Sequence, residues 1–179
     1  MATLPPHPST DFNPPELQVP ATPAGPIVAE GSHRAWVLSD DHRRIDFARV
    51  TEWLQGSYWC PGIPRAAVEQ AARHSSLVVG AYDSPSGQQV GFLRVVSDCT
   101  RFAYLMDVYV ASELRGCGLG RAMVRFALNH PPHRDVARWM LGTRDAHGVY
   151  AREGFEPLAE PDRLMQRNRP APWEPAGSR

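Results

Sequence analysis

The chain of 179 residues contains no lysine, so arginine alone supplies its 19 basic side chains. Without lysine, the chain lacks both a Schiff-base lysine and the lysine that a Walker-type loop places on a nucleotide phosphate. The 19 basic residues are balanced by 19 acidic residues. This neutrality argues against a nucleic-acid-binding protein, because such proteins usually carry a basic excess.

Cysteine is also scarce. Cys60, Cys99 and Cys117 are odd in number and far apart, which matches neither a zinc-ligand spacing nor a disulfide framework. No apolar run is long enough to cross a bilayer, and the first residues lack the basic start and apolar segment of a secretory signal. We therefore expect a cytoplasmic protein that has no metal, no membrane contact and no nucleic-acid partner.

Proline is concentrated at the two ends of the chain. Residues 1–30 combine proline with alanine and short polar side chains, and residues 169–179 are similar. Such segments cannot bury enough apolar surface to fold. We expect disordered tails at 1–30 and 169–179 and one domain over 33–168. A domain of about 150 residues buries roughly 70% of its unfolded surface and needs no disulfide.

Apolar periodicity predicts a mixed α/β domain with a central sheet. The predicted helices span 45–56, 64–74, 119–130 and 144–153. The predicted strands span 34–39, 76–82, 89–96, 101–110 and 136–142, and further strands are expected at 155–158 and 163–167. The alternating apolar residues that we expect on one face of the strand at 101–110 are Phe102, Tyr104, Met106, Val108 and Val110.

Residues 115–120 read RGCGLG and separate the strand at 101–110 from the helix at 119–130. Glycines let the backbone approach an anion closely, and the N–H groups at a helix N-terminus attract it. A Walker loop is excluded, because Arg121 and Ala122 stand where lysine and serine or threonine are required. The G-x-G-x-G spacing disfavours a dinucleotide loop. On these residues alone, a simple tight turn remains an alternative.

Two longer stretches carry a family resemblance. DVYVASELRGCGLGRAMV (107–124) and DAHGVYAREGF (145–155) resemble the central and later motifs of the GNAT superfamily of acyl-CoA-dependent N-acyltransferases. The resemblance implies a GNAT-like mixed sheet flanked by about four helices. It also implies that this sheet splays between 101–110 and 136–142 to form an acetyl-CoA cleft.

The same resemblance implies the cofactor contacts. The glycine loop would hold the pyrophosphate of acetyl-CoA, and the backbone of 108–110 would pair with the pantetheine arm. The implied contact residues are Val108, Tyr109, Val110, Arg115, Gly116, Cys117, Gly118, Leu119, Gly120, Arg121 and Thr143. The family often has asparagine where this chain has Thr143, so its hydroxyl either binds pantetheine or caps the following helix.

Acetyl transfer implies two proton transfers. Tyr150 matches the motif tyrosine and is implied to protonate the departing thiolate, with a core aromatic role as the alternative. The attacking amine must be neutral, which costs about 4.6 kcal/mol at pH 7 for a pKa near 10.4. Asp107 is the first candidate base because a carboxylate interrupts an apolar strand there; a structural hydrogen bond is the alternative. His147, one turn before Tyr150, is the second candidate base.

Tyr58 and Trp59 are adjacent in the loop QGSYWCPGIPR (55–65). We expect them to form a wall of the substrate pocket, with a hydrophobic plug under the loop as the alternative. The sequence thus predicts an acetyl-CoA-dependent N-acetyltransferase that acts by direct attack on an amine of a small molecule or peptide, as a monomer or a homodimer. The alternative function is an idle acyl-CoA-binding sensor or regulatory module.

Overall fold

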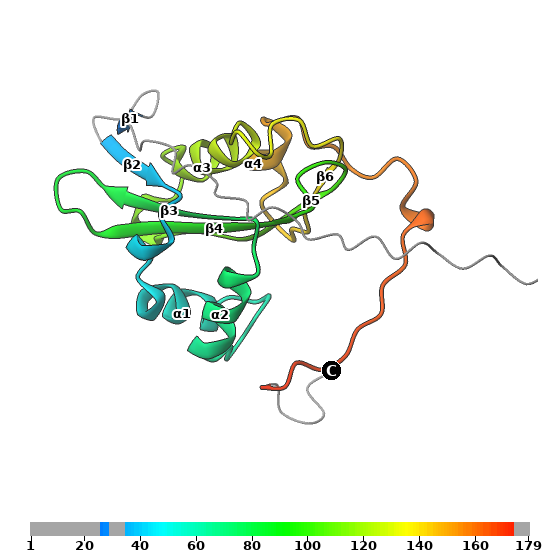
Figure 1. The fold of residues 1–179 in the computed structure, drawn as a ribbon, viewed down its shortest axis with the longest axis horizontal. Coiled ribbons are helices and arrows are strands. Elements are labelled where there is room, and N and C mark those ends of the chain that lie inside the picture. Colours follow the sequence, from blue (N-terminus) through cyan, green and yellow to red (C-terminus); the bar gives the residue numbers. More distant parts are fainter. Residues whose placement is uncertain (1–25, 29–34, 174–179) are drawn as a thin grey trace, which may run out of the picture.

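The computed structural model describes residues 26–28 and 35–173 (Figure 1). The helices are α1 (Phe47–Gln55), α2 (Arg65–Arg73), α3 (Leu119–Leu128) and α4 (His147–Ala151), with short 3-10 turns η1 (His42–Arg44), η2 (Ser112–Leu114) and η3 (Pro161–Arg163). The strands are β1 (Pro26–Val28), β2 (Ala35–Ser39), β3 (Leu77–Asp83), β4 (Gln89–Ser97), β5 (Ala103–Val110) and β6 (Trp139–Met140).

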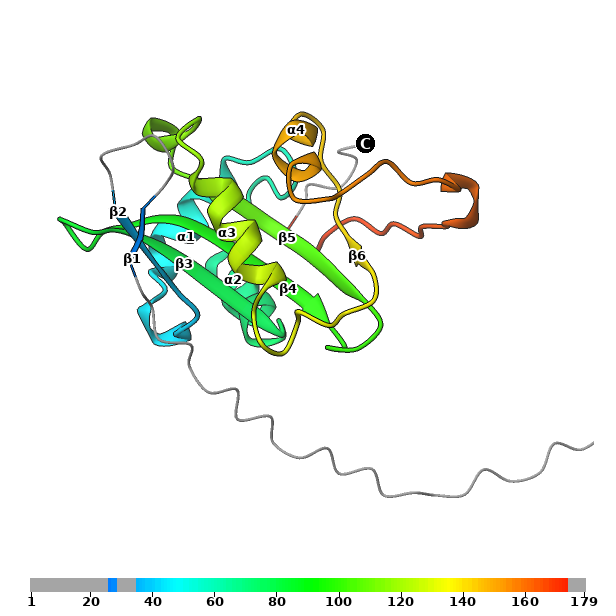
Figure 2. The ribbon, with the colours of Figure 1, turned by 90° about the horizontal axis from the view of Figure 1, so that it is seen from above.

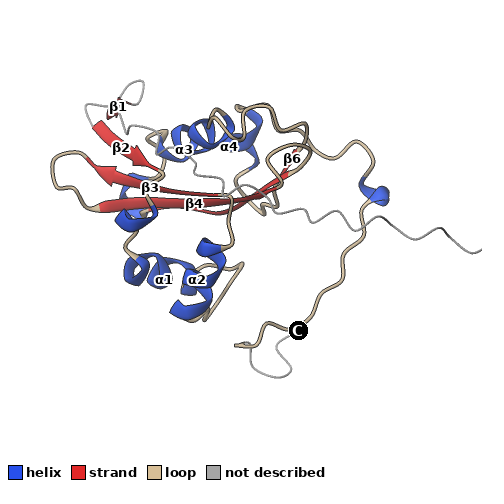
Figure 3. Cartoon of the chain, viewed as in Figure 1, coloured by secondary structure: helices blue, strands red, loops and turns tan. Residues whose placement is uncertain are grey.

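The strands, drawn in red in Figure 3, form one sheet in the order β1-β2-β3-β4-β5-β6. Neighbouring strands are antiparallel except β5 and β6, which are parallel. The predicted mixed α/β class is confirmed. Most of the predicted tail at 1–30 lies outside the described residues, although Pro26–Val28 within it pairs with β2.

Helices cover both faces of the sheet. Figure 1 shows α3 and α4 on one face and α1 and α2 on the other, and Figure 2 shows α3 crossing the strands obliquely. Because side chains alternate along a strand, the side chains of β3 pack against the helices on both faces of the sheet. Val79 packs into the cluster beneath α3, whereas its neighbour Val78 packs into the cluster against α1 and α2. The continuous apolar run of β3 follows from this double burial.

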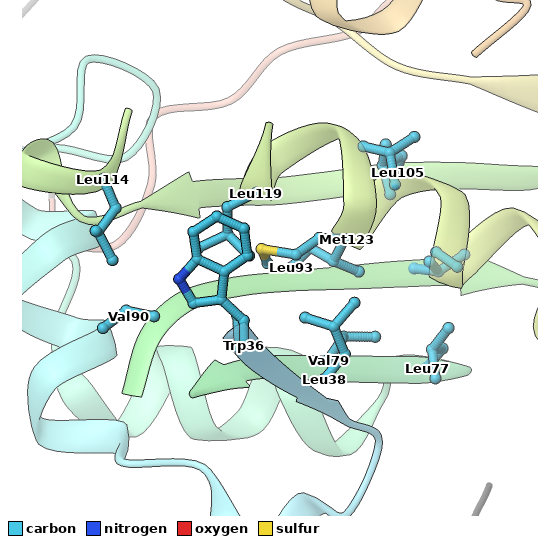
Figure 4. Close-up of a cluster of buried hydrophobic side chains, with 14 of the residues drawn as sticks. Trp36, Leu38, Leu77, Val79, Val90, Leu93, Leu105, Leu114, Leu119 and Met123 are labelled. Atoms are coloured by element: carbon cyan, nitrogen blue, oxygen red, sulfur yellow. The ribbon is translucent and has the colours of Figure 1, made fainter. Parts of the chain in front are cut away.

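The larger of the two hydrophobic clusters lies between the sheet and α3 (Figure 4). Trp36, Leu93 and Met123 are its largest members with no exposed surface. Burying a side chain of this size contributes about 1.5–3 kcal/mol relative to leaving it exposed. This cluster fixes α3, and therefore the loop that precedes α3, against the centre of the sheet.

A β-bulge in β5 reverses the direction of its side chains. Phe92 pairs with Tyr109 and Arg94 with Met106, so two residues of β5 lie opposite one residue of β4. Before the bulge the odd-numbered residue Leu105 belongs to the cluster beneath α3, whereas after it the even-numbered residue Val108 packs there. The prediction that 102–110 keep one face throughout is therefore wrong, because an inserted residue inverts the alternation.

The C-terminal elements also differ from the prediction. β6 contains two residues of the expected strand at 136–142, and α4 contains five residues of the expected helix at 144–153. The strands expected at 155–158 and 163–167 are absent from the described chain. Two prolines explain part of this difference: Pro157 offers no backbone N–H to a ladder, and Pro161 begins η3 instead. In the described part of the chain, no helix has the length and hydropathy that a membrane crossing requires.

A series of buried polar side-chain contacts joins four parts of the fold. His133 Nε2 lies 3.0 Å from Ser76 Oγ and 3.8 Å from Cys99 Sγ. Its Nδ1 lies 3.3 Å from His130 Nδ1, and His130 Nε2 lies 3.0 Å from Asp40 Oδ2. These contacts tie the ends of β2 and α3 to the start of β3 and to the β4–β5 turn.

Burial, together with a smaller contribution from the neighbouring His130, lowers the pKa of His133 to about 4. The unfolded chain binds a proton at this histidine below a pH of about 6.5. Between those two values the unfolded state binds more protons than the folded state, so stability falls as the pH falls.

We predict that His133→Gln reduces this acid sensitivity. The wild-type protein should lose about 2 kcal/mol more of its unfolding free energy between about pH 6.5 and pH 5 than the variant loses. Urea unfolding at the two pH values measures the difference. The control is His147→Gln, which changes an exposed histidine and should retain the wild-type pH dependence. Equal acid sensitivity in His133→Gln and wild type would contradict the assignment.

Candidate active site

A cleft opens where β5 and β6 part. The two strands pair at only two positions, Ala103 with Trp139 and Tyr104 with Met140. Beyond Tyr104, the edge of β5 that faces β6 has no strand partner among the described residues. The cleft that results has a volume of about 1970 Å³, larger than the ~300–1,000 Å³ of typical small-ligand pockets. It therefore has room for a long ligand together with a second, smaller one.

Asp107 sits at the bulge of β5 and on the wall of the cleft. Its φ is +53°, in the left-handed region, a conformation that aspartate tolerates better than most residues. Its Oδ2 accepts a hydrogen bond of 2.5 Å from Arg94 Nε, and the two side chains are 10% and 12% exposed. The strained backbone and the ion pair together fix a carboxylate at the point where the strands separate.

The RGCGLG loop forms a cradle of backbone N–H groups. Gly116 and Gly118 have φ values of +81° and +87°, which residues with a side chain rarely adopt. Gly118 is the N-cap of α3 and no side chain caps the helix. Within the described chain, the N–H groups of residues 116–121 donate to no backbone carbonyl. The N-terminus of α3 and these N–H groups make a site suited to an anion.

Arginines surround the cradle, and each is held by another group. Arg115 donates from Nε to the Val110 carbonyl oxygen at 3.2 Å, and its guanidinium lies 5.4 Å from the centre of the Tyr109 ring. Arg121 donates from Nε to Glu153 Oε1 at 2.5 Å. Hydrogen bonds from Arg125 and Arg121 lower the pKa of the Glu153 carboxyl despite its burial. Glu153, which the sequence analysis missed, therefore orients Arg121 beside the helix N-terminus.

Two other predicted cofactor residues make local contacts. The Cys117 thiol donates to the Leu114 carbonyl oxygen at 2.9 Å, which turns it back toward η2. Thr143 Oγ1 accepts from the Ala146 N–H at 3.1 Å, so this hydroxyl caps the turn that leads into α4. Both residues line the cleft. The Thr143 hydroxyl does not cap α4 itself, whose N-cap residue is Ala146, and its contact with a cofactor stays a prediction.

Tyr150 and His147 are close in α4 but differ in their surroundings. Tyr150 is half-buried on the cleft wall, with its ring edge-on to Phe155 at 6.0 Å. Burial raises the pKa of Tyr150 to about 12, and Tyr58 and Asp145 add to this shift. The phenol therefore stays protonated at neutral pH. His147 is exposed and is not among the cleft-lining residues.

Aromatic side chains form the end of the cleft near α1 and α2. Tyr58 and Trp59 meet edge-to-face at 4.9 Å and are 44% and 42% exposed. The Arg144 guanidinium lies 3.8 Å from the centre of the Tyr58 ring, and the Arg144 N–H donates to Tyr58 Oη at 3.0 Å. Trp173 also lines the cleft and packs against the α1–α2 cluster. Because Trp173 lies within the predicted tail 169–179, the sequence analysis missed it; a lone tryptophan among prolines was the available signal.

The fold thus brings most of the predicted site residues into one cleft. Those that line it are Tyr58, Trp59, Asp107, Val108, Tyr109, Val110, Arg115, Gly116, Cys117, Gly118, Gly120, Arg121, Thr143 and Tyr150. The side chain of Leu119, by contrast, is 1% exposed in the cluster beneath α3. No group of His, Cys, Asp or Glu in the described part of the chain is arranged to hold a metal ion.

These features suit an elongated ligand with an anionic group. The N–H cradle is suited to the anion, and the free edge of β5 offers backbone groups to an extended chain. A half-buried phenol lies on the wall, and the aromatic side chains leave room for a second molecule. Such an arrangement can hold two reactants together and exclude part of the solvent.

Comparisons with known proteins agree with this description. A family model described as an acetyltransferase (GNAT) domain matches residues 73–157. A candidate acetyltransferase of Gibberella zeae is 32% identical over 114 residues, which make up 53% of this chain and 63% of that protein. The chain therefore spans less than two thirds of the length of this curated relative.

Solved structures extend the similarity to the whole fold. A candidate GNAT-family acetyltransferase from Xanthomonas campestris pv. campestris is 38% identical, with a TM-score of 0.72 over 78% of this chain and 97% of that one. A candidate acetyltransferase from Deinococcus radiodurans is 22% identical, with a TM-score of 0.60 over 75% and 88% of the two chains. The second likeness supports the fold alone.

The backbone of the cradle gives a stability prediction. Gly118→Ala should lower the unfolding free energy by about 1–2 kcal/mol, because alanine is strained in the left-handed region. Gly148→Ala should instead raise it by up to about 1 kcal/mol, since Gly148 lies within α4 and an added Cβ meets no atom within 4 Å. Urea or thermal unfolding of both variants measures whether the unfolding free energy falls in one and rises in the other. A Gly118→Ala protein as stable as wild type would contradict the strained cradle.

Proposed function

The chain belongs to the GNAT family of acetyltransferases, and from that premise we propose that it transfers the acetyl group of acetyl-CoA to an amine of a small molecule or peptide. One observation carries the proposal. Residues of the N–H cradle before α3, of the β5 edge without a strand partner, and Tyr150 all line a single cleft. Separate positions in the sequence thus supply an anion site, a backbone edge and a proton donor to one space.

The residues present suit acetyl-CoA. We assign its pyrophosphate to the N–H groups of residues 116–121, with Arg115 and Arg121 adding positive charge at the same end. The extended arm would lie along the free edge of residues 108–110. Acetyl-CoA supplies an acetyl thioester, in which the amine attacks the carbonyl carbon and the sulfur leaves as a thiolate.

Tyr150 is proposed to stabilise that sulfur by donating a hydrogen bond. With its pKa raised to about 12, full proton transfer to a thiolate of pKa about 8.5 costs roughly 5 kcal/mol. A donated hydrogen bond avoids that cost, since the proton stays on the phenol oxygen while the charge on sulfur develops. Burial also guarantees that the donor carries its proton at neutral pH.

Asp107 is proposed as the group that receives the proton of the amine. It lies on the cleft wall at the bulge, whereas His147 is exposed and outside the cleft lining. The carboxylate also attracts an ammonium group into the cleft. Its ion pair with Arg94 limits its freedom, so transfer through a bridging water fits the geometry better than a movement of the side chain.

The acceptor is proposed to bind at the aromatic end. Tyr58, Trp59 and Trp173 offer flat apolar surface there, and Asp107 lies on the same cleft wall. An amine attached to an apolar or aromatic body would use both features. The alternative function is an acyl-CoA-binding module without turnover. It is supported by the ion pair between Asp107 and Arg94, because this pair engages the carboxylate of the proposed base.

One experiment separates the two functions. The protein is incubated with acetyl-CoA and a panel of amines, free thiol is measured with a thiol reagent, and acetyl-CoA binding is measured by calorimetry. Thiol release that depends on an amine supports the transferase. Binding without thiol release on every amine tested favours the binding module.

Gly120→Asp serves as the matched inactive variant. Gly120 is the second residue of α3, and an added Cβ would meet only Val110 Cγ2 at 3.5 Å, an ordinary contact. An acidic residue in a first helical turn is favourable for folding, but here its charge repels the pyrophosphate. We expect acetyl-CoA affinity to fall by at least about 100-fold, or ~2.7 kcal/mol. The uncharged Gly120→Asn should lose much less; equal affinity of Gly120→Asp and wild type would contradict the cradle.

Tyr150→Phe tests the hydrogen bond to sulfur. Loss of the phenol oxygen should lower kcat by about 100-fold, while the Kd for acetyl-CoA changes little because the cradle is intact. Steady-state kinetics and calorimetry separate the two effects. An unchanged kcat would instead assign Tyr150 to packing against Phe155.

A further inference from the structure

The ion pair between Arg94 and Asp107 has hydrogen-bonding capacity that the protein leaves unused. A guanidinium carries five N–H donors, and an ionised carboxylate accepts at both of its oxygens. Arg94 donates from Nε to Asp107 Oδ2 and, at 3.5 Å, from Nη1 to Ser75 Oγ. Within the described residues these are the only hydrogen bonds of the two side chains. Arg94 Nη2 and Asp107 Oδ1 therefore have no protein partner there.

This unused capacity lies inside the cleft. Both side chains line the cleft, although they are only 12% and 10% exposed. The loss of hydration of such a pair is repaid only when further hydrogen bonds satisfy its remaining donors and acceptors. Because one hydrogen bond joins the two groups, the free N–H and the free oxygen are neighbours. The pair thus offers adjacent positive and negative sites to a molecule in the cleft.

Arg94 projects from the sheet face that α1 and α2 cover (Figure 1). It pairs with Val78, which belongs to the cluster against those helices, and directly paired residues of an antiparallel ladder share a face. Met106, the partner of Arg94 in β5, lies on the same face and also lines the cleft. Trp173 packs against the same cluster as Val78.

The loop between α1 and α2 also lies close to the ion pair. Burial raises the pKa of the Cys60 thiol in this loop, and the charges of Asp107 and Arg94 make smaller contributions in opposite directions. Cys60 directly follows Trp59. The ion pair and the aromatic side chains therefore border the same part of the cleft.

We propose that the acceptor is an α-amino acid with a large apolar or aromatic side chain, a substrate class that rests on the acetyl transfer proposed above. Its carboxylate accepts hydrogen bonds from the free N–H groups of Arg94, and its ammonium donates to Asp107 Oδ1. Its side chain packs against Trp59 and Trp173. Because one carbon carries both charged groups of an α-amino acid, they match the adjacent opposite charges of the ion pair. A simple amine would satisfy Asp107 alone.

The same contacts prepare the amine for attack. Asp107 receives one proton of the ammonium through a water molecule, which leaves a lone pair on the nitrogen. This lone pair forms the C–N bond at the thioester carbonyl carbon, the C–S bond breaks, and its electron pair leaves on the sulfur. The new amide nitrogen releases a second proton to solvent. The products are an N-acetyl amino acid and the CoA thiolate.

Matched acceptors test the carboxylate contact. L-Phenylalanine and phenethylamine share an aromatic body and an amine, but only L-phenylalanine has a carboxylate. Amine-dependent thiol release from acetyl-CoA should give a kcat/KM at least about tenfold higher for L-phenylalanine, because a hydrogen bond to a charged group is lost with phenethylamine. Glycine keeps both charges but lacks the apolar body, so its kcat/KM should also be at least about tenfold lower than that of L-phenylalanine.

Arg94→Gln separates recognition of the carboxylate from catalysis. Any effect of this variant on Asp107 or on folding lowers the rates with L-phenylalanine and phenethylamine alike. The ratio of the two kcat/KM values should nevertheless fall by at least about tenfold, because only L-phenylalanine loses a contact. Arg144→Gln is the matched control, since it removes another arginine of the cleft and should keep the wild-type ratio. A ratio that Arg94→Gln leaves unchanged, or that Arg144→Gln abolishes, would overturn the proposal.

Calorimetry on the protein saturated with CoA measures acceptor binding without turnover. L-Phenylalanine should bind at least about tenfold more tightly than phenethylamine. Equal or better turnover of phenethylamine would overturn the amino-acid assignment and leave the acetyl transfer standing. Tight binding of L-phenylalanine without thiol release would instead overturn the acetyl transfer and support the amino-acid site. No binding of L-phenylalanine, L-tryptophan or L-methionine would overturn the proposal outright.

Discussion

The parting of β5 from β6 after two paired residues is the constraint on which the site depends. A continued ladder would hold the backbones of these two strands at hydrogen-bonding distance and leave no cleft. Because the ladder stops, the edge of β5 beyond Tyr104 has no strand partner among the described residues. The same opening lies next to the N-terminus of α3, so the anion cradle and the free edge belong to one continuous cleft.

Because of the bulge at Asp107, β5 contributes side chains both to the core beneath α3 and to the wall of the cleft. Before the bulge, Leu105 fills the core beneath α3; after it, Val108 takes that place and Tyr109 stacks on Trp53 of α1 at 5.0 Å. The inversion turns a core strand into a cleft wall within a few residues. It also exposes Asp107 to the cleft, where the Arg94 ion pair holds its carboxylate. Bulges beside functional sites commonly re-aim side chains in this manner.

Several charged side chains that line the cleft are held by other groups. Glu153 holds Arg121 beside the cradle, Arg94 holds Asp107 at the bulge, and Tyr58 supports Arg144 at the aromatic end. Each pair fixes a side chain whose entropy would otherwise oppose ligand binding. The preorganised groups lie at three places along the cleft, which matches a long ligand meeting a second reactant.

The sequence by itself determined most of the helices and strands and the position of the glycine cradle, and it pointed to Tyr150 as a candidate site residue. These features depend on local spacing and on residues with special backbone geometry. The mixed class and the family followed from the same local motifs. Sequence periodicity could not locate the bulge, since one inserted residue changes only the pairing between strands. Nor could it find Arg94, Glu153 or Trp173, which reach the site from distant segments. Only the tertiary structure decided these contacts, because packing across the sheet, and not neighbourhood along the chain, brings those side chains together.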